Sequence, residues 1–271
     1  MSTSATYYPR ALMARCIFAW LLIILVYFFC THSLVHQLQQ PALQYPGSDN
    51  TFWVVMASGI YQFFVQQKWA AVLFDVVLIA SCMLVIIFPQ KKYLPILPIA
   101  GVWLLYIFFC GTAGKQYAQI GFLITPVAFL AFATNKFNML WNAVRYWVCF
   151  LYVVAGVSKM LYGGFGFAEN MSNILMQDNA QSFVFVQKGF WFKISSYFIE
   201  NPSIAQWLYR LAALFEAACI VGFFTKKYDK WLLIGLVSFH VGNLFLLNIS
   251  FVEQSLIFAP FLPWHKWAKA N

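Results

Sequence analysis

The chain has 271 residues, of which 62% are hydrophobic, 20% aromatic and only 9% charged. A soluble domain carries about a quarter Asp, Glu, Lys and Arg, so this composition excludes a water-soluble globule and favours a chain surrounded by lipid. The net charge of +9 would suggest a nucleic-acid partner in a soluble protein. In a membrane protein the same excess is typical of cytoplasmic loops rich in Lys and Arg. We therefore expect an integral membrane protein that contacts the lipid bilayer and no nucleic acid.

Apolar runs along the chain predict an all-α polytopic bundle of about eight transmembrane helices, forming one domain over residues 1–271. A helix needs ~20 residues to cross ~30 Å of hydrocarbon. The apolar runs lie at about 12–30, 69–88, 94–110, 117–133, 143–162, 204–224, 231–247 and 250–264. Two long connections, 31–68 and 163–203, are expected to be outer loops. Within the second, the aromatic-rich stretch 183–198 is typical of a segment lying in the membrane interface.

The Lys and Arg residues of the loops orient this bundle. One set of loops carries eleven of them: Arg10, Arg15, Lys91, Lys92, Lys136, Arg145, Lys226, Lys227, Lys230, Lys266 and Lys269. The alternate set carries five: Lys68, Lys115, Lys188, Lys193 and Arg210. By the positive-inside rule this bias places both termini in the cytoplasm. We expect a multi-pass protein of the bacterial cytoplasmic (inner) membrane.

Several ionisable residues lie inside the predicted spans. They are Asp75, Lys159, Arg210, Glu216 and Glu253, joined by His240 and the polar Asn243. A charge at mid-membrane costs about 2.5–3.5 kcal/mol, so each charged group requires an explanation. Their depths, counted at about 1.5 Å per residue, place the ionisable groups in the outer half of the bilayer or just below it. We predict an outward-opening pocket lined by Lys159, Glu216, His240 and Arg210, with Asp75 and Glu253 at its margins.

The same residues have a structural interpretation that the sequence leaves open. Carboxylates and bases can pair as interhelical struts, a lysine near a span end can snorkel to the interface, and His240 can be a hydrogen-bonded core residue. In the pocket interpretation, desolvation of Lys159 would favour the free amine that a general base requires. The histidines show no HExxH spacing, so no metal site is expected. Nucleotide-binding and α/β-hydrolase motifs are also absent from the sequence.

The six cysteines are scattered singly through apolar runs, and no CxxC pair occurs among them. This pattern counts against a thiol relay or a zinc knuckle. Burial as small hydrophobic side chains is the simplest interpretation. A disulfide between Cys30 and Cys110 is left open, because both residues are expected near the outer ends of their spans.

The fifth run contains the sequence Arg145-Tyr-Trp-Val-Cys-Phe-Leu-Tyr-Val-Val-Ala-Gly-Val-Ser-Lys159-Met-Leu. It resembles the Arg…Tyr…Ala-Gly-x-x-Lys-Leu signature of the vitamin K-dependent γ-carboxylase transmembrane domain. The wider bacterial group is the HTTM (horizontally transferred transmembrane) family. Later, Leu214-Phe215-Glu216, Phe239-His240 and Ile249-Ser-Phe251 look like the Glu…Phe-His…Phe series of that family. The likeness covers roughly residues 140–262, together with the first span.

The resemblance implies a function for this chain. In the carboxylase, the lysine of the signature is the base that deprotonates vitamin K hydroquinone, and the chemistry opens to the lumenal side. Lys159 matches that lysine, which implies a carboxylase-like or quinone-dependent membrane enzyme. Its cofactor would be a quinone or hydroquinone and its catalytic residues Lys159 and His240, with Arg145 of the signature in the pocket. We also expect Asn243, as a polar residue inside a predicted span, to belong to the pocket.

Two observations keep a second function open: one difference from the carboxylase and one similarity to another group of membrane proteins. The carboxylase has a large extramembrane domain for its glutamate-rich substrate, and this sequence has none, so carboxylation of protein glutamates is not expected. Short helices with Arg, Glu and Phe-His features also occur in DoxX/MauE-like membrane proteins. The alternative is a non-catalytic membrane subunit, or a maturation factor for a partner protein or secreted peptide at the outer face. The sequence does not identify the substrate or the reaction.

Overall fold

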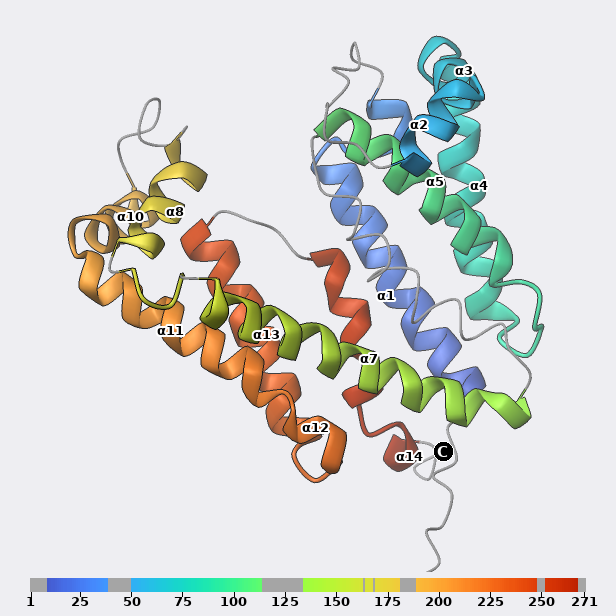
Figure 1. Cartoon of the computed structure of the whole chain (residues 1–271). Helices are drawn as coiled ribbons and strands as arrows, with labels where there is room; N and C mark the ends of the chain where they lie inside the picture. Colours follow the sequence, from blue (N-terminus) through green and yellow to red (C-terminus); the bar gives the residue numbers. More distant parts are fainter. Residues whose placement is uncertain are drawn as a thin grey trace, which may run out of the picture. The chain divides into compact units, whose positions relative to one another are not determined.

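The structure is a computed structural model that describes residues 9–38, 50–113, 134–162, 164–167, 169–180, 189–247 and 252–267. Every regular element in these ranges is a helix (Figure 1). Contacts within the chain divide it into two compact units, Met1–Val144 with Glu253–Asn271 and Arg145–Val252. We describe each unit by itself, and one domain over 1–271 stays a prediction.

The helices follow one another with short connections in the described ranges. The N-terminal unit contains α1 (Arg10–Cys30), the 3-10 helix η1 (Val35–Gln37), α2 (Asn50–Ala57), α3 (Ile60–Gln66), α4 (Lys68–Ile87), α5 (Ile96–Ala113), the start of α7 (Thr134–Leu161), nearly all of the 3-10 helix η3 (Val252–Phe261) and α14 (Trp264–Trp267). The second unit contains the rest of α7, then α8 (Asn170–Asp178), α10 (Phe190–Glu200), α11 (Pro202–Ala218), α12 (Val221–Phe224) and α13 (Asp229–Leu247).

Five helical segments are long and apolar enough to cross a membrane. They are Arg10–Gln37, Lys68–Ile87, Lys136–Leu161, Pro202–Phe224 and Asp229–Leu247. Each coincides with an apolar run expected from the sequence, so the predicted all-helical class is confirmed and five of the predicted spans are candidate membrane-spanning helices. This architecture fits an integral membrane protein.

The other three predicted spans have different outcomes. Helix α5 covers the run at 94–110, and the run at 117–133 lies outside the described residues. The run at 250–264 forms the 3-10 helix η3 and the short α14 instead of one long α-helix. Pro260 lies inside η3, and proline removes a backbone donor and crowds the preceding turn, which breaks an α-helix. The number of eight spans therefore stays a prediction, as do the cytoplasmic termini.

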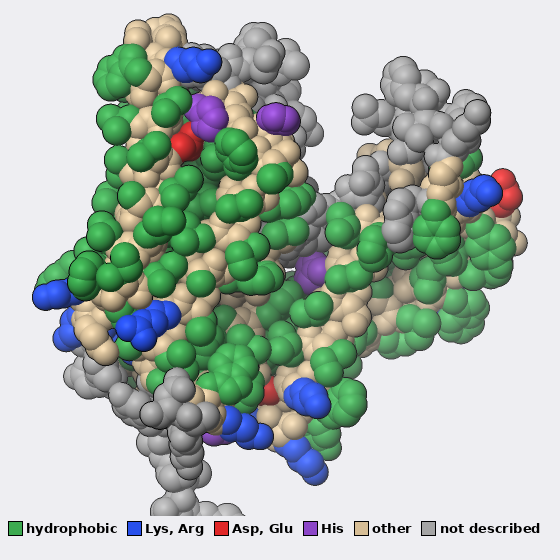
Figure 2. Space-filling view, turned by 180° about the vertical axis from the view of Figure 1, so that it is seen from behind, with side chains coloured by type: hydrophobic (Ala, Val, Ile, Leu, Met, Phe, Trp, Pro, Cys, Tyr) green, Lys and Arg blue, Asp and Glu red, His purple; other side chains and the backbone are tan. Residues whose placement is uncertain are grey.

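Helices α1, α4 and α5 form the core of the N-terminal unit, with α4 packed against both of the others. The buried face of α1 recurs every three or four residues, at Ile17, Leu21, Ile24 and Phe28, as expected for a helix with one packed side. Other apolar side chains of these helices are exposed. Hydrophobic side chains are accordingly spread over the described part of the visible face, and the few charged side chains are scattered among them (Figure 2). Such an apolar exterior is typical of helices that contact lipid.

In the second unit, glycines allow α7 and α13 to approach α11 closely. A Cβ atom at Gly156 on α7 would lie 2.5 Å from the Ala217 amide nitrogen and 2.6 Å from the Ala213 carbonyl oxygen. A Cβ atom at Gly235 on α13 would collide with the ring of Phe215. Small residues at such contacts are the usual means by which membrane helices pack backbone to backbone. The close packing brings side chains of all three helices together.

The predicted outer loop 163–203 contains two helices that pack on α11. Met171 and Leu175 of α8 form a buried cluster with Ala205 of α11, and Phe198 of α10 packs against it. The Asn179 amide nitrogen donates to the Leu246 carbonyl oxygen at 2.9 Å, which fixes the end of α8 to α13. The loop is therefore helical over much of its described length. Its position in the outer interface stays a prediction.

Candidate functional site

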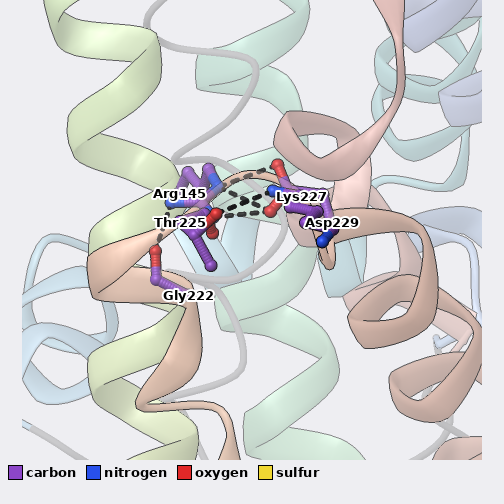
Figure 3. A network of polar contacts seen from close by, with 5 residues as sticks. All are labelled: Arg145, Gly222, Thr225, Lys227 and Asp229. Carbon is purple, nitrogen blue, oxygen red and sulfur yellow. Dashed lines mark hydrogen bonds and ion pairs between the residues drawn. The ribbon is translucent and has the colours of Figure 1, made fainter.

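Arg145 is the most fully bonded charged side chain among the described residues. Its Nε donates to both carboxylate oxygens of Asp229, at 3.1 and 3.0 Å, and Nη2 donates to the same carboxylate. Nη1 and Nη2 also donate to the carbonyl oxygens of Gly222 and Thr225, at 2.5 and 2.8 Å (Figure 3). The side chain is almost fully buried, at 2% exposure.

This network has a structural role, because it connects α7 to the end of α12 and to the start of α13. The two carbonyls lie at the end of α12, where helix carbonyls lack partners within the helix. Arg145 satisfies them and also binds the first residue of α13. Arg145 lies fourteen residues before Lys159 on the same helix, which corresponds to about 21 Å along its axis. The structure thus does not bring Arg145 together with the other proposed pocket residues of α7 and α11.

Lys159 and Glu216 form an ion pair that joins α7 to α11. The Lys159 Nζ donates to both carboxylate oxygens of Glu216, each at 2.6 Å. The Glu216 side chain is buried, with 4% exposure, whereas Lys159 is 31% exposed. The same Nζ lies 5.5 Å from the centre of the Phe239 ring of α13. The ammonium group therefore lies near a carboxylate and an aromatic ring, and the lysine side chain is partly accessible.

A second polar pair, Tyr152 of α7 and His240 of α13, also lies near Phe239. The Tyr152 hydroxyl and the His240 Nε2 are 2.5 Å apart, and which atom donates depends on the histidine tautomer. The His240 ring meets the Phe239 ring edge to face at 5.2 Å. Of the residues predicted to share a pocket, Lys159 and His240 thus both lie beside the Phe239 ring, and Glu216 is bound to Lys159.

Tyr152 is a residue that the sequence interpretation missed. It precedes Lys159 by seven residues, with Gly156 between them, and this spacing places all three on one face of a helix. The sequence therefore predicts that Tyr152 lies on the same helix face as Lys159. It does not predict that Tyr152 contacts His240, because these residues are 88 positions apart.

Arg210 lies six residues before Glu216 on α11 and is bound by the turn that follows α7. Its Nε donates to the Phe165 carbonyl oxygen at 3.0 Å. The neighbouring Gln206 donates to the carbonyls of Gly164 and Phe165 at 2.7 and 3.2 Å. The Phe165 amide in turn donates to the Lys159 carbonyl oxygen at 3.2 Å. The turn at 164–165 thereby links the end of α7 to α11.

Asp75 belongs to the N-terminal unit and has partners there. Its carboxylate accepts from the backbone amides of Val35 and His36, at 3.2 and 2.9 Å, and contacts His36 Nδ1 at 2.7 Å. These contacts hold η1 on α4. The placement of Asp75 at a pocket margin stays a prediction.

Three further expectations concern Asn243, Glu253 and the cysteines. Asn243 is half-buried on α13, three residues after His240, and the side chain of Glu253 lies outside the described residues. Cys30 forms no disulfide with any described residue. The side chain of Cys110 is not described, so its pairing with Cys30 stays untested. Within the described ranges, no group of three His, Cys, Asp or Glu side chains is placed to hold a metal ion.

Comparison of this chain with protein-family models, with curated proteins and with solved structures gave no match. The candidate functional groups of this chain are the Lys159–Glu216 pair, the Tyr152–His240 pair and the Phe239 ring, which lies near Lys159 and His240.

Proposed function

We propose that this chain is a multi-pass membrane enzyme of the carboxylase-like or quinone-dependent type, with Lys159 as its base. The observation that supports this proposal is the unequal burial of the ion pair. The Glu216 side chain is enclosed at 4% exposure, while the Lys159 side chain is 31% exposed and its Nζ lies beside an aromatic ring. A ligand can therefore approach the lysine side chain, while the glutamate side chain is shielded from water.

The ion pair offers a route to the free amine. A proton that moves from Lys159 Nζ to a Glu216 oxygen, over 2.6 Å, leaves a neutral amine and a neutral acid. Removal from water disfavours charged groups, so a dry site lowers the cost of that exchange. The free amine then accepts the proton of an acidic hydroxyl, such as that of a hydroquinone. The products are the substrate anion and the Lys159 ammonium, and Glu216 keeps the first proton.

The aromatic groups in the cluster suit a flat, apolar ligand. The rings of Phe215 and Phe239 lie 6.4 Å apart at an interplanar angle of 33°, and the Tyr152–His240 pair adds a proton donor or acceptor beside them. A quinone ring has two faces for aromatic contact and two oxygens for hydrogen bonds. This chemistry supports a quinone-type ligand for the proposed enzyme.

Two variants of Lys159 test the proposal. Lys159→Arg keeps the positive charge and the pairing with Glu216 but has no accessible free-base form. If Lys159 is the base, both Lys159→Arg and Lys159→Ala abolish activity, measured as rescue of a deletion strain, and Lys159→Arg keeps normal membrane yield. Full rescue by Lys159→Arg would show that the lysine is a strut.

The alternative is a non-catalytic subunit that matures or anchors a partner at its outer face. The observation in its favour is a set of exposed aromatic side chains in α10 and in the segment before α8. Phe167 and Phe190 are each 67% exposed, and Tyr197 is 52% exposed. Native mass spectrometry of the purified protein, combined with lipid extraction, separates the two functions. A bound quinone supports the enzyme, and a co-purifying polypeptide supports the subunit.

The proposal includes the finer topology: about eight spans, both termini in the cytoplasm of a bacterial inner membrane, and 31–68 and 163–203 outside. Single cysteines in a cysteine-free background test it. An impermeant thiol reagent added to intact cells should label Ser48→Cys and Ser182→Cys. It should not label Ser4→Cys or Lys227→Cys. Labelling at position 4 would reverse the orientation.

A further inference from the structure

The guanidinium group of Arg210 is bound through its Nε and lies beside two aromatic rings, and Arg210 itself is half-buried. The Nε donates to the Phe165 carbonyl oxygen at 3.0 Å. The guanidinium carbon lies 4.9 Å from the centre of the Trp207 ring and 5.6 Å from that of Phe165. A guanidinium that is ordered in this way loses little entropy when its two terminal nitrogens bind a ligand.

Those terminal nitrogens have no acidic partner within the part of the chain that the structure describes. Asp75, Glu216 and Asp229, the buried or half-buried carboxylates of the described helices, bind His36, Lys159 and Arg145. Arg210 lies inside Pro202–Phe224, one of the segments able to cross a membrane. An arginine in such a segment is costly without a counter-charge. We therefore expect an anion from outside the described residues to neutralise the charge of Arg210.

The surface beside Arg210 is apolar and accessible. Trp207 is 60% exposed, Leu211 is 58% exposed and Leu214 is 49% exposed, and all three lie within four residues of Arg210 on α11. A ligand of Arg210 would have its anionic group at the guanidinium and apolar groups along these side chains. Glycerophospholipids combine these two features, with a phosphodiester on acyl chains.

We propose that Arg210 binds the phosphodiester of an anionic glycerophospholipid through its two terminal nitrogens, with the acyl chains along Trp207, Leu211 and Leu214. Two parallel N–H···O bonds from guanidinium to phosphate oxygens have the geometry that arginine provides. Gln206 acts as a positioning residue, because it donates to the same Phe165 carbonyl that binds Arg210 and also to the adjacent Gly164 carbonyl. The inference does not rest on the proposed enzymatic function, since it uses none of the Lys159 cluster.

Native mass spectrometry of the full-length protein in a neutral detergent tests the site with three probes. Dioleoyl-phosphatidylglycerol has both the phosphate and the tails, dioleoylglycerol has the tails alone, and inorganic phosphate has the anion alone. The wild-type protein should bind the phosphatidylglycerol and neither of the others at the same concentration. Equal binding of inorganic phosphate would show a site for free anions, and equal binding of dioleoylglycerol would show lipid contact without Arg210; either result overturns the proposal.

Variants of Arg210 complete the test. Loss of a charge-assisted bidentate contact should weaken phosphatidylglycerol binding by about tenfold or more in Arg210→Gln. Arg210→Lys, which keeps the charge but not the paired donors, should give an intermediate affinity. The matched control is Arg15→Gln, which removes an exposed arginine from α1 and should not change the affinity. If Arg210→Gln does not fold, Arg210→Lys decides the question, and wild-type affinity in that variant would overturn the proposal.

Discussion

Gly156 of α7 lies directly against Ala217 of α11, with space for a hydrogen atom and none for a methyl group. Ala217 follows Glu216 in the chain, and Gly156 precedes Lys159 by three residues. The 2.6 Å contacts between the Lys159 amine and the Glu216 carboxylate therefore depend on this backbone contact. On α7, the ion pair lies about one helical turn from this close contact.

A methyl group at position 156 should separate the two helices. Gly156→Ala places its Cβ atom 2.5 Å from a backbone nitrogen, which cannot move without the helix. Overpacking of this kind typically destabilises by about 1–3 kcal/mol. We expect a lower unfolding temperature in detergent. The control is Gly242→Ala on α13, where nothing lies within 4 Å of the added atom and no loss of stability is expected. Equal unfolding temperatures for the two variants would contradict the packing argument.

Removal of Lys159 alone should be more harmful than removal of the whole ion pair. In Lys159→Met the Glu216 carboxylate, with 4% exposure, is left without its cation. Stranding a buried charge costs up to about 3–5 kcal/mol, although access of water to the exposed side of the site reduces this. The double variant Lys159→Met with Glu216→Gln removes both charges and should regain much of the loss. Thermal unfolding of the two proteins measures the difference. A double variant that is less stable than the single one would contradict this account of the pair.

Substitution of Arg145 should destabilise the second unit even when the charge is kept. Lysine cannot reproduce the fork that binds Asp229 together with the Gly222 and Thr225 carbonyls, because its donors diverge from one nitrogen. Unsatisfied buried groups typically cost about 1–3 kcal/mol each. We expect Arg145→Lys and Asp229→Asn to lower the unfolding temperature by similar amounts. Lys227→Gln, an exposed change in the same connection, serves as the control and should leave the unfolding temperature unchanged.

Asp75→Asn should release η1 from α4 in the N-terminal unit. The Asp75 carboxylate accepts from two backbone amides and contacts the His36 ring. An asparagine side chain offers one acceptor oxygen and turns an NH2 group toward the donors. Hydrogen exchange at the Val35 amide should accelerate, while amides in α11 and α13 should keep their protection. His36→Ala removes only the ring contact and should have a smaller effect. Unchanged exchange at Val35 in Asp75→Asn would show that the carboxylate does not hold η1.

The sequence by itself determined the class of protein and the positions of five long apolar helices, because hydrophobicity over about 20 residues is a local property. It also singled out Lys159, Glu216, Arg210 and His240, since charged groups stand out in apolar runs. It did not distinguish the 3-10 helix at 252–261 from a further span, because hydropathy is insensitive to the backbone effect of Pro260.

Only the tertiary structure decided which of the charged residues in the apolar helices form ion pairs with one another. Lys159 pairs with a residue 57 positions away, and Arg145 with one 84 positions away, which no local pattern can specify. Asp229 lay in a predicted cytoplasmic connection, yet it is the carboxylate that binds Arg145. Arg210, equally charged and close to Glu216 on α11, faces a turn of carbonyls and aromatic rings instead of an acid. The packing of α7 and α13 on α11, set by small residues such as Gly156 and Gly235, assigns each charge its partner because it determines which helix faces can come within bonding distance.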